Sequence, residues 1–181
     1  AGGLMHGFQI WVNLPAKHKM MAPRYQEIPE ADSPTVERDG VWARVIAGEC
    51  LGVTSSIDTV IPISLIHVKM EEGAVLNQTI ASGLNGMIYV FSGSIRVNDQ
   101  LSVRKQPMPF GIGIKQQVSD GELALLSDGE TVEITCDSPC DLLILAGPEI
   151  DEPIARYGPF VMNTREEIHQ AVIDYQNGTF A

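Results

Sequence analysis

The sequence predicts an all-β fold, a sandwich or barrel of short strands, followed by one C-terminal α-helix. Between Val41 and Gly147 the chain consists of short runs rich in β-branched and other apolar residues. Glycine, proline, aspartate and asparagine separate these runs, which follow one another closely and show no helical period, as in sandwiches and barrels. The predicted strands cover residues 41–47, 60–70, 87–97, 110–114, 122–127, 131–136 and 141–146.

The size and composition of the chain indicate one globular domain with extensions. It has 181 residues, of which 44% are hydrophobic and 19% charged, so it is too apolar to be disordered. Its net charge of -11 argues against direct binding to nucleic acid or to an anionic membrane. The short basic segment with Lys17, His18, Lys19 and Arg24 is interpreted as a solvated loop.

The cysteines and the N-terminus indicate a reducing compartment. Cys50, Cys136 and Cys140 are an odd number without the density of a disulfide scaffold, and two thiols alone fall short of a zinc site. Buried or edge positions are expected for them. Because no apolar run reaches about 18 residues and the start lacks signal-peptide features, we expect a cytoplasmic protein, or a nuclear one in a eukaryote.

The N-terminal residues predict one further strand. Phe8, Ile10, Val12 and Leu14 alternate with more polar residues, and Pro15 ends the run. Pro23, Pro29 and Pro34 among charged residues then predict a long irregular linker over residues 16–40.

The last residues change to helical periodicity. Asn163 is expected to cap a helix over residues 164–177, with Glu166 completing a capping box and Gly178 ending it. The apolar side chains that fall on one face of this helix are Ile168, Ala171, Val172 and Tyr175. This face should dock onto the barrel or a neighbouring domain.

Two pairs of glycines stand at a characteristic spacing between the strands. Gly73 and Gly93 form the first pair, and Gly121 and Gly129 form the second. Glycine allows the sharp turns that short strands need. The spacing resembles the two hairpin motifs of cupin barrels, also called double-stranded β-helices or jelly rolls, although single matches are weak in a chain with 17 glycines.

The metal-ligand positions of these motifs hold residues with no side-chain donor or, at Thr79, a poor ligand for iron or zinc. Thr79, Ala81 and Gly86 replace two histidines and a glutamate in the first motif. In the second, Ser127 replaces a proline and Val132 the last histidine. Because these side chains lack suitable donor atoms, we expect no metal, cofactor or catalytic residue in this chain. Their small size would leave an interior pocket unless larger neighbours fill it.

The remaining ionisable residues offer no replacement site. No two of His6, His18, His67 and His169 are close enough in sequence to form a ligand pair. Glu71 with Glu72 is interpreted as a solvated turn, and Glu166 with Glu167 as a helix N-terminus.

Both ends of the chain resemble the pirin family. Residues 6–15 (HGFQIWVNLP) and 22–26 (APRYQ) resemble the segment that joins the two cupin domains of pirins, and residues 157–164 (YGPFVMNT) resemble their C-terminal signature. The resemblance implies a bicupin whose N-terminal barrel binds one iron through three histidines and a glutamate, and whose C-terminal barrel is metal-free. It implies either quercetin 2,3-dioxygenase-like activity or iron-dependent co-regulation of transcription factors or metabolic enzymes.

This chain would begin just beyond the last iron ligands of the family, so no ligand can be assigned to a residue here. The expected divisions are the last strand of an N-terminal cupin domain (1–15), a linker (16–40), the C-terminal cupin domain (41–150) and an extension with a helix (151–181).

The expected function is that of a metal-free, structural and partner-binding half of an iron-dependent bicupin. The alternative is part of a quercetin 2,3-dioxygenase-like oxygenase whose active site lies in the N-terminal domain. This chain alone is not expected to be an enzyme. Its acidic charge suits a basic protein partner. Uncovered apolar residues between Phe8 and Leu14 predict self-association.

Overall fold

The computed structural model describes residues 3, 5–98, 116–127 and 129–180. These residues form two compact units, one of residues 26–149 and one of residues 1–25 with 150–181. The predicted strand at residues 110–114 lies outside the described residues.

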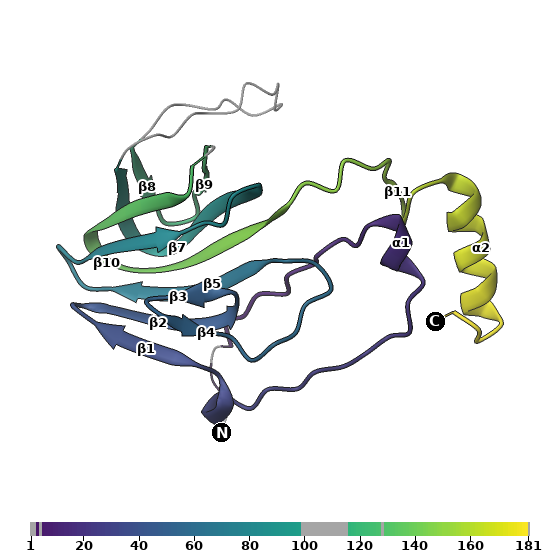
Figure 1. The fold of residues 1–181 in the computed structure, drawn as a ribbon, viewed down its shortest axis with the longest axis horizontal. Helices are drawn as coiled ribbons and strands as arrows, with labels where there is room; N and C mark the ends of the chain where they lie inside the picture. The colour runs from purple at the N-terminus through teal and green to yellow at the C-terminus, as the bar shows by residue number, and fades with distance from the viewer. Residues whose placement is uncertain (1–2, 4, 99–115, 128, 181) are drawn as a thin grey trace. The chain divides into compact units, whose positions relative to one another are not determined.

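The larger unit contains an eight-stranded antiparallel sheet in the order β1-β2-β5-β10-β7-β8, in which β6 also pairs with β10 and β9 with β7 (Figure 1). β3 and β4 form a separate two-stranded hairpin. The strands are β1 (Thr35–Arg38), β2 (Val41–Ala47), β3 (Glu49–Cys50), β4 (Val53–Thr54), β5 (Ser64–Met70), β6 (Val75–Thr79), β7 (Leu84–Asn98), β8 (Gln117–Ser119), β9 (Leu123–Leu125) and β10 (Thr131–Pro148).

The two long strands, β7 and β10, hold this unit together (Figure 1). The first part of β10 pairs with β6, and its second part pairs with β5, while β7 runs along almost its whole length. The register shifts at Cys136, Ser138 and Asp141, which marks a bulge. The two predicted strands at 131–136 and 141–146 are therefore one strand, because the bulge bends the chain without ending its pairing.

The interior of the larger unit is an apolar core. In β2, every second residue from Val41 to Ala47 is buried, and β5 and β10 add Ile66, Val68 and Ile144 with no exposed surface. This period of two is expected when one face of each strand packs inward. The predicted all-β barrel is confirmed.

The predicted linker at residues 16–40 is more ordered than expected. It contains the four-residue helix α1 (Ala16–Lys19), a 3₁₀ turn (Glu30–Asp32) and strand β1. β1 pairs with β2 through a two-residue turn in which Asp39 and Gly40 have φ of 51° and 75°. Positive φ at both positions is the signature of a type I′ turn, for which Asp-Gly is a preferred sequence.

The predicted strand from Phe8 to Leu14 is wrong in this structure. Residues 7–15 have no regular secondary structure, and Trp11 is 61% exposed. A strand needs a neighbour for its backbone N–H and C=O groups, and no segment of the described residues pairs with this one. The assignment of residues 1–15 to a preceding domain stays a prediction.

The C-terminal residues form the hairpin of β11 (Ala155–Tyr157) and β12 (Phe160–Met162), followed by α2 (Arg165–Gln176). The helix packs against this hairpin, with Ala171 buried and Phe160 5.7 Å from Tyr175 between ring centroids. No helix among the residues described is long and apolar enough to cross a bilayer.

The cap of α2 lies one residue later than predicted. Thr164, not Asn163, is the N-cap, and its hydroxyl accepts a hydrogen bond from the Glu167 backbone N–H at 3.1 Å. Asn163 instead donates its side-chain amide to Glu152. The predicted stop at Gly178 is confirmed, since its φ of 70° allows the backbone to close the helix.

Candidate functional site

The first pair of motif glycines has the mechanical role that their spacing predicts. Gly73 (φ 81°) turns the chain into β6, and its N–H donates to the Cys136 carbonyl at 2.9 Å. Gly93 (φ 75°) lies against the bulge of β10, where an added β-carbon would overlap the Pro139 carbonyl oxygen. The glycines therefore allow the close contacts that Gly73 before β6 and Gly93 in β7 make with β10.

The two histidine positions of the first motif face away from the core. Thr79 and Ala81 are exposed, whereas Gln78 and Ile80 are buried. The motif spacing is one residue out of step with β6, and a one-residue shift reverses the face of every side chain. The expected interior placement of Thr79 and Ala81 is therefore wrong. The alternation of Leu76 and Ile80 was the sequence signal for the correct face.

Gln78 is the polar group that sequence reasoning missed at this position. It is 3% exposed, and its amide donates to the carbonyls of Glu49 at 2.8 Å and Thr79 at 2.9 Å. A buried amide needs such partners. Gln78 thus ties β6 to the β3 strand, next to an open pocket of about 580 Å³ that Thr79 and Ala81 also line.

The other two ligand positions face the core and are packed. The Leu126 side chain lies 2.9 Å from where a β-carbon on Gly86 would stand, and Val132 belongs to the apolar core cluster. Neighbouring side chains therefore fill the interior here. Neither residue has a side-chain donor, so these positions do not fit a metal ion. No three His, Cys, Asp or Glu side chains gather around a possible ion anywhere in the described part of the chain.

The three cysteines are all buried and none forms a disulfide. The Cys136 and Cys140 sulfur atoms lie 3.6 Å apart at the bulge of β10. Burial raises the pKa of Cys140 to about 12, and the Cys136 thiol adds to this shift. Burial, with a smaller contribution from Glu49, raises the pKa of Cys50 to about 11. Protonated, buried thiols of this kind are poor nucleophiles.

Aromatic and charged side chains gather on the face of the sheet that points away from the core. His67 Nε2 lies 3.0 Å from Asp141 Oδ1, and Lys69 Nζ lies 3.7 Å from the same oxygen. The His67 ring lies between Trp42 and Phe91, with centroids 5.3 and 5.6 Å away. We call these five residues the outer-face cluster. The structure places His6, His18 and His169 elsewhere, on the N-terminal segment, α1 and α2.

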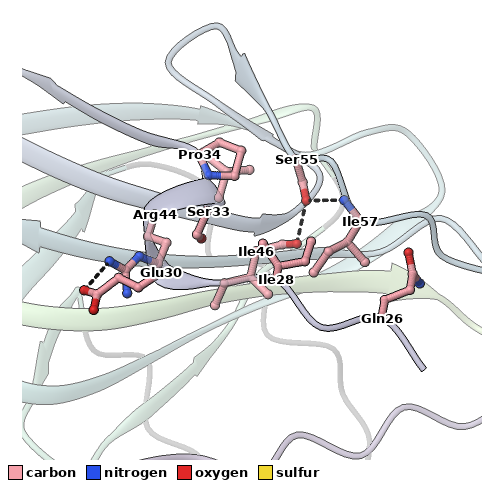
Figure 2. A pocket seen from close by; sticks show the side chains of 10 residues that line it. Gln26, Ile28, Glu30, Ser33, Pro34, Arg44, Ile46, Ser55 and Ile57 are labelled. Atoms are coloured by element: carbon pink, nitrogen blue, oxygen red, sulfur yellow. Dashed lines mark hydrogen bonds and ion pairs between the residues drawn. The ribbon is translucent and has the colours of Figure 1, made fainter.

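A pocket of about 460 Å³ adjoins this cluster at Arg44, whose guanidinium carbon lies 5.4 Å from the centroid of the Trp42 ring. Figure 2 shows Arg44 paired with Glu30 on one wall and isoleucine side chains on the others. Its Nη2 atom donates to Glu30 Oε1 at 3.0 Å.

The comparisons with known proteins place these features in a family. Residues 65–181, more than half of the chain, match the pirin C-terminal cupin domain. The chain belongs to the pirin family. The metal positions just described thus lie in the C-terminal cupin domain of a pirin-family chain, and the predicted family and cupin fold are confirmed.

The relatives of this pirin-family chain are longer than the chain itself. Mouse pirin is 35% identical over 174 residues, which are 95% of this chain and 56% of that protein. A putative quercetin 2,3-dioxygenase of Vibrio cholerae is 36% identical over 98% of this chain and 60% of its own length. The structure of quercetin 2,3-dioxygenase from Acinetobacter baumannii matches with a TM-score of 0.79 and 30% identity, covering 94% of this chain and 55% of that one. The chain thus spans a little over half the length of these relatives.

Proposed function

We propose that this chain is the metal-free, structural and partner-binding half of an iron-dependent pirin-family protein. The iron would lie in the half that corresponds to the part of the relatives that this chain does not span. The proposal rests on the packing at Gly86 and Val132, two of the positions that correspond to metal ligands in the cupin motifs. Leu126 fills the space over Gly86, and Val132 lies in the core, which supports a structural role for this barrel.

The outer-face cluster supports the partner-binding role. Trp42, His67 and Phe91 present aromatic surface between the charges of Lys69 and Asp141. Aromatic side chains surrounded by polar groups are enriched among the residues that dominate protein interfaces. The net charge of -11 favours a basic partner protein through its effect on association rate and specificity.

Metal analysis tests the metal-free role. This chain and full-length mouse pirin are incubated anaerobically with Fe²⁺, desalted and measured by elemental analysis. We expect bound iron in mouse pirin and none above background in this chain, because Thr79, Ala81, Gly86 and Val132 supply no ligand set. One iron per chain would contradict the proposal.

The alternative function is a contribution to a quercetin 2,3-dioxygenase-like oxygenase. The observation that favours it is the similarity to proteins named as quercetin 2,3-dioxygenases in Vibrio cholerae and Acinetobacter baumannii. Flavonol loss is measured by absorbance with Fe²⁺ and oxygen, for this chain and for the Vibrio relative in parallel. Turnover by the relative alone favours an active site in the part that this chain does not span, whereas turnover by this chain rejects the metal-free role.

A further inference from the structure

The pocket beside Arg44 differs in chemistry from the positions that correspond to the metal ligands of the cupin motifs. It lies between residues 26–34, β2 and the segment after β4. Ile28, Ile46, Ile57 and Pro34 supply apolar walls, and Arg44 supplies a fixed positive charge (Figure 2). A volume of about 460 Å³ is within the usual range for small-molecule sites.

The side chains of Ser55 and Gln26 on the pocket wall already have partners. The Ser55 hydroxyl donates to the Ile46 carbonyl at 2.6 Å and accepts from the Ile57 N–H at 3.0 Å (Figure 2). The Gln26 amide both donates to and accepts from the Asp58 backbone. These bonds hold the pocket wall in place and leave these groups committed to the protein.

Arg44 differs from these two residues. Its Nη2 bonds to Glu30, but its Nε–H is buried and has no hydrogen-bond acceptor. A buried donor on a charged group without an acceptor is unfavourable, and such groups in native proteins call for an explanation. Nε and Nη2 lie on one edge of the guanidinium, the edge that can hold a carboxylate through two parallel hydrogen bonds.

Glu30 is a weak partner for Arg44. It makes one hydrogen bond to Arg44, and its side chain is 84% exposed, against 28% for Arg44. An exposed ion pair contributes little free energy. A ligand carboxylate can therefore replace Glu30, whose side chain turns into solvent, and it satisfies both Nε and Nη2 once Arg44 turns its buried Nε towards the pocket.

We propose that this pocket binds a small organic carboxylate with an apolar body, its carboxylate on Arg44 and its body against Ile28, Ile46 and Ile57. The site is separate from the former metal positions at Gly86 and Val132, so it does not depend on the proposed function. Its specificity combines charge recognition at one end with apolar contact at the other.

Nuclear magnetic resonance of the arginine side chains tests the proposal directly, with benzoate as the probe. The Arg44 Nε–Hε signal is expected to shift downfield and saturate at millimolar benzoate, because the proton gains a charged acceptor. Benzyl alcohol has the same ring without the charge and should leave this signal in place. No shift of the Arg44 signal at about 50 mM benzoate, corresponding to affinity too weak for a site, would overturn the proposal.

Two substitutions make the test specific. Glu30→Gln removes the competing carboxylate and should tighten benzoate binding about threefold or more, whereas Arg44→Lys removes the two-donor edge and should weaken it about tenfold. Arg96→Lys is the matched control, since Arg96 pairs with Asp137 at 2.8 Å and does not line the pocket. Benzoate binding by the Arg44→Lys variant is followed by backbone amide shifts, which also report whether the variant is folded.

A third arm separates carboxylate recognition from general anion binding. Inorganic phosphate carries the charge without the apolar body, so it should bind at least about tenfold more weakly than benzoate. Equal affinity for phosphate and benzoate would show that the isoleucine wall contributes nothing, and it would overturn the assigned ligand class. Unchanged affinity in the Glu30→Gln variant would likewise reject displacement of Glu30.

Discussion

Gly93 and Pro139 are in such close contact that a β-carbon on Gly93 would overlap the Pro139 carbonyl oxygen, and it would lie 2.9 Å from the Cys140 Cα. Gly93→Ala should therefore lower the free energy of unfolding by more than about 3 kcal/mol, since backbone must move and φ is 75°. Gly121→Ala is the control. Gly121 has a similar φ of 78° but open space around it, so about 1–2 kcal/mol is expected. Urea unfolding measures both, and equal losses would show that the contact is unimportant.

The raised pKa of Cys50 predicts a loss of stability in alkali. Its pKa is about 11 in the folded protein and 9.0 for an unperturbed thiol. Above pH 9 the unfolded chain releases this proton while the folded chain keeps it, so the free energy of unfolding falls as pH rises towards 11. The effect is absent well below pH 9, where the thiol is protonated in both states.

Cys50→Ala isolates this contribution from other groups that titrate in alkali. Between about pH 9.5 and 10.5, the native protein should lose about 1 kcal/mol more per pH unit than the variant. Urea unfolding at several pH values gives the two slopes. Parallel slopes would mean that Cys50 ionises as easily in the folded protein as in the unfolded chain.

The capping box of α2 predicts different effects for two adjacent glutamates. The Glu167 carboxylate accepts hydrogen bonds from the backbone N–H groups of Asn163 at 2.8 Å and Thr164 at 2.9 Å. Glu167→Ala should lower the opening free energy of the first turn by about 1 kcal/mol. Glu166→Ala removes the same charge from the same turn without these bonds, and its effect should be a few tenths of a kcal/mol. Amide hydrogen exchange of the first turn compares them.

The exposed N-terminal segment predicts self-association, which we propose as a property of this chain. Phe8, Ile10, Trp11 and Val12 are each more than a third exposed. Trp11→Ser should shift light-scattering mass towards the monomer at high concentration, because it removes the largest apolar contact. Ile154→Ser is the control, since Ile154 is 70% exposed on a different segment. A native chain that stays monomeric at high concentration would contradict this proposal.

The sequence predicted those parts of the fold whose signal is local. The alternation in β2 and the capping pattern of α2 are visible in a few consecutive residues, although the N-cap is Thr164 and not the predicted Asn163. The sequence did not predict β1, because Pro34 and the charged residues of β1 are typical of a linker. Asp39-Gly40 was nevertheless a hairpin signal. The sequence predicted two strands in place of β10 because Pro139 interrupts the apolar run. In the structure, pairing with β5 and β7 keeps the chain extended through this segment.

The candidate site was less predictable because it depends on register between distant strands. The glycine spacing identified the framework around Gly93, but it placed Thr79 on the wrong face of β6. The outer-face cluster joins His67 on β5 to Asp141 on β10, and no local pattern announces which residues will be opposite each other. The pocket at Arg44 likewise forms only after β2 meets the segment that contains Glu30.

The central position of β10 also has a consequence for synthesis of the protein. β5 and β7 are neighbours only through β10, which is the last strand of the barrel to leave the ribosome. Until residue 148 has emerged, both strands have an edge without its final partner, and the apolar side chains of Ile66 and Ile88 lack their cover. The nascent barrel is thus most exposed to aggregation during translation, and its assembly is completed by a single late strand.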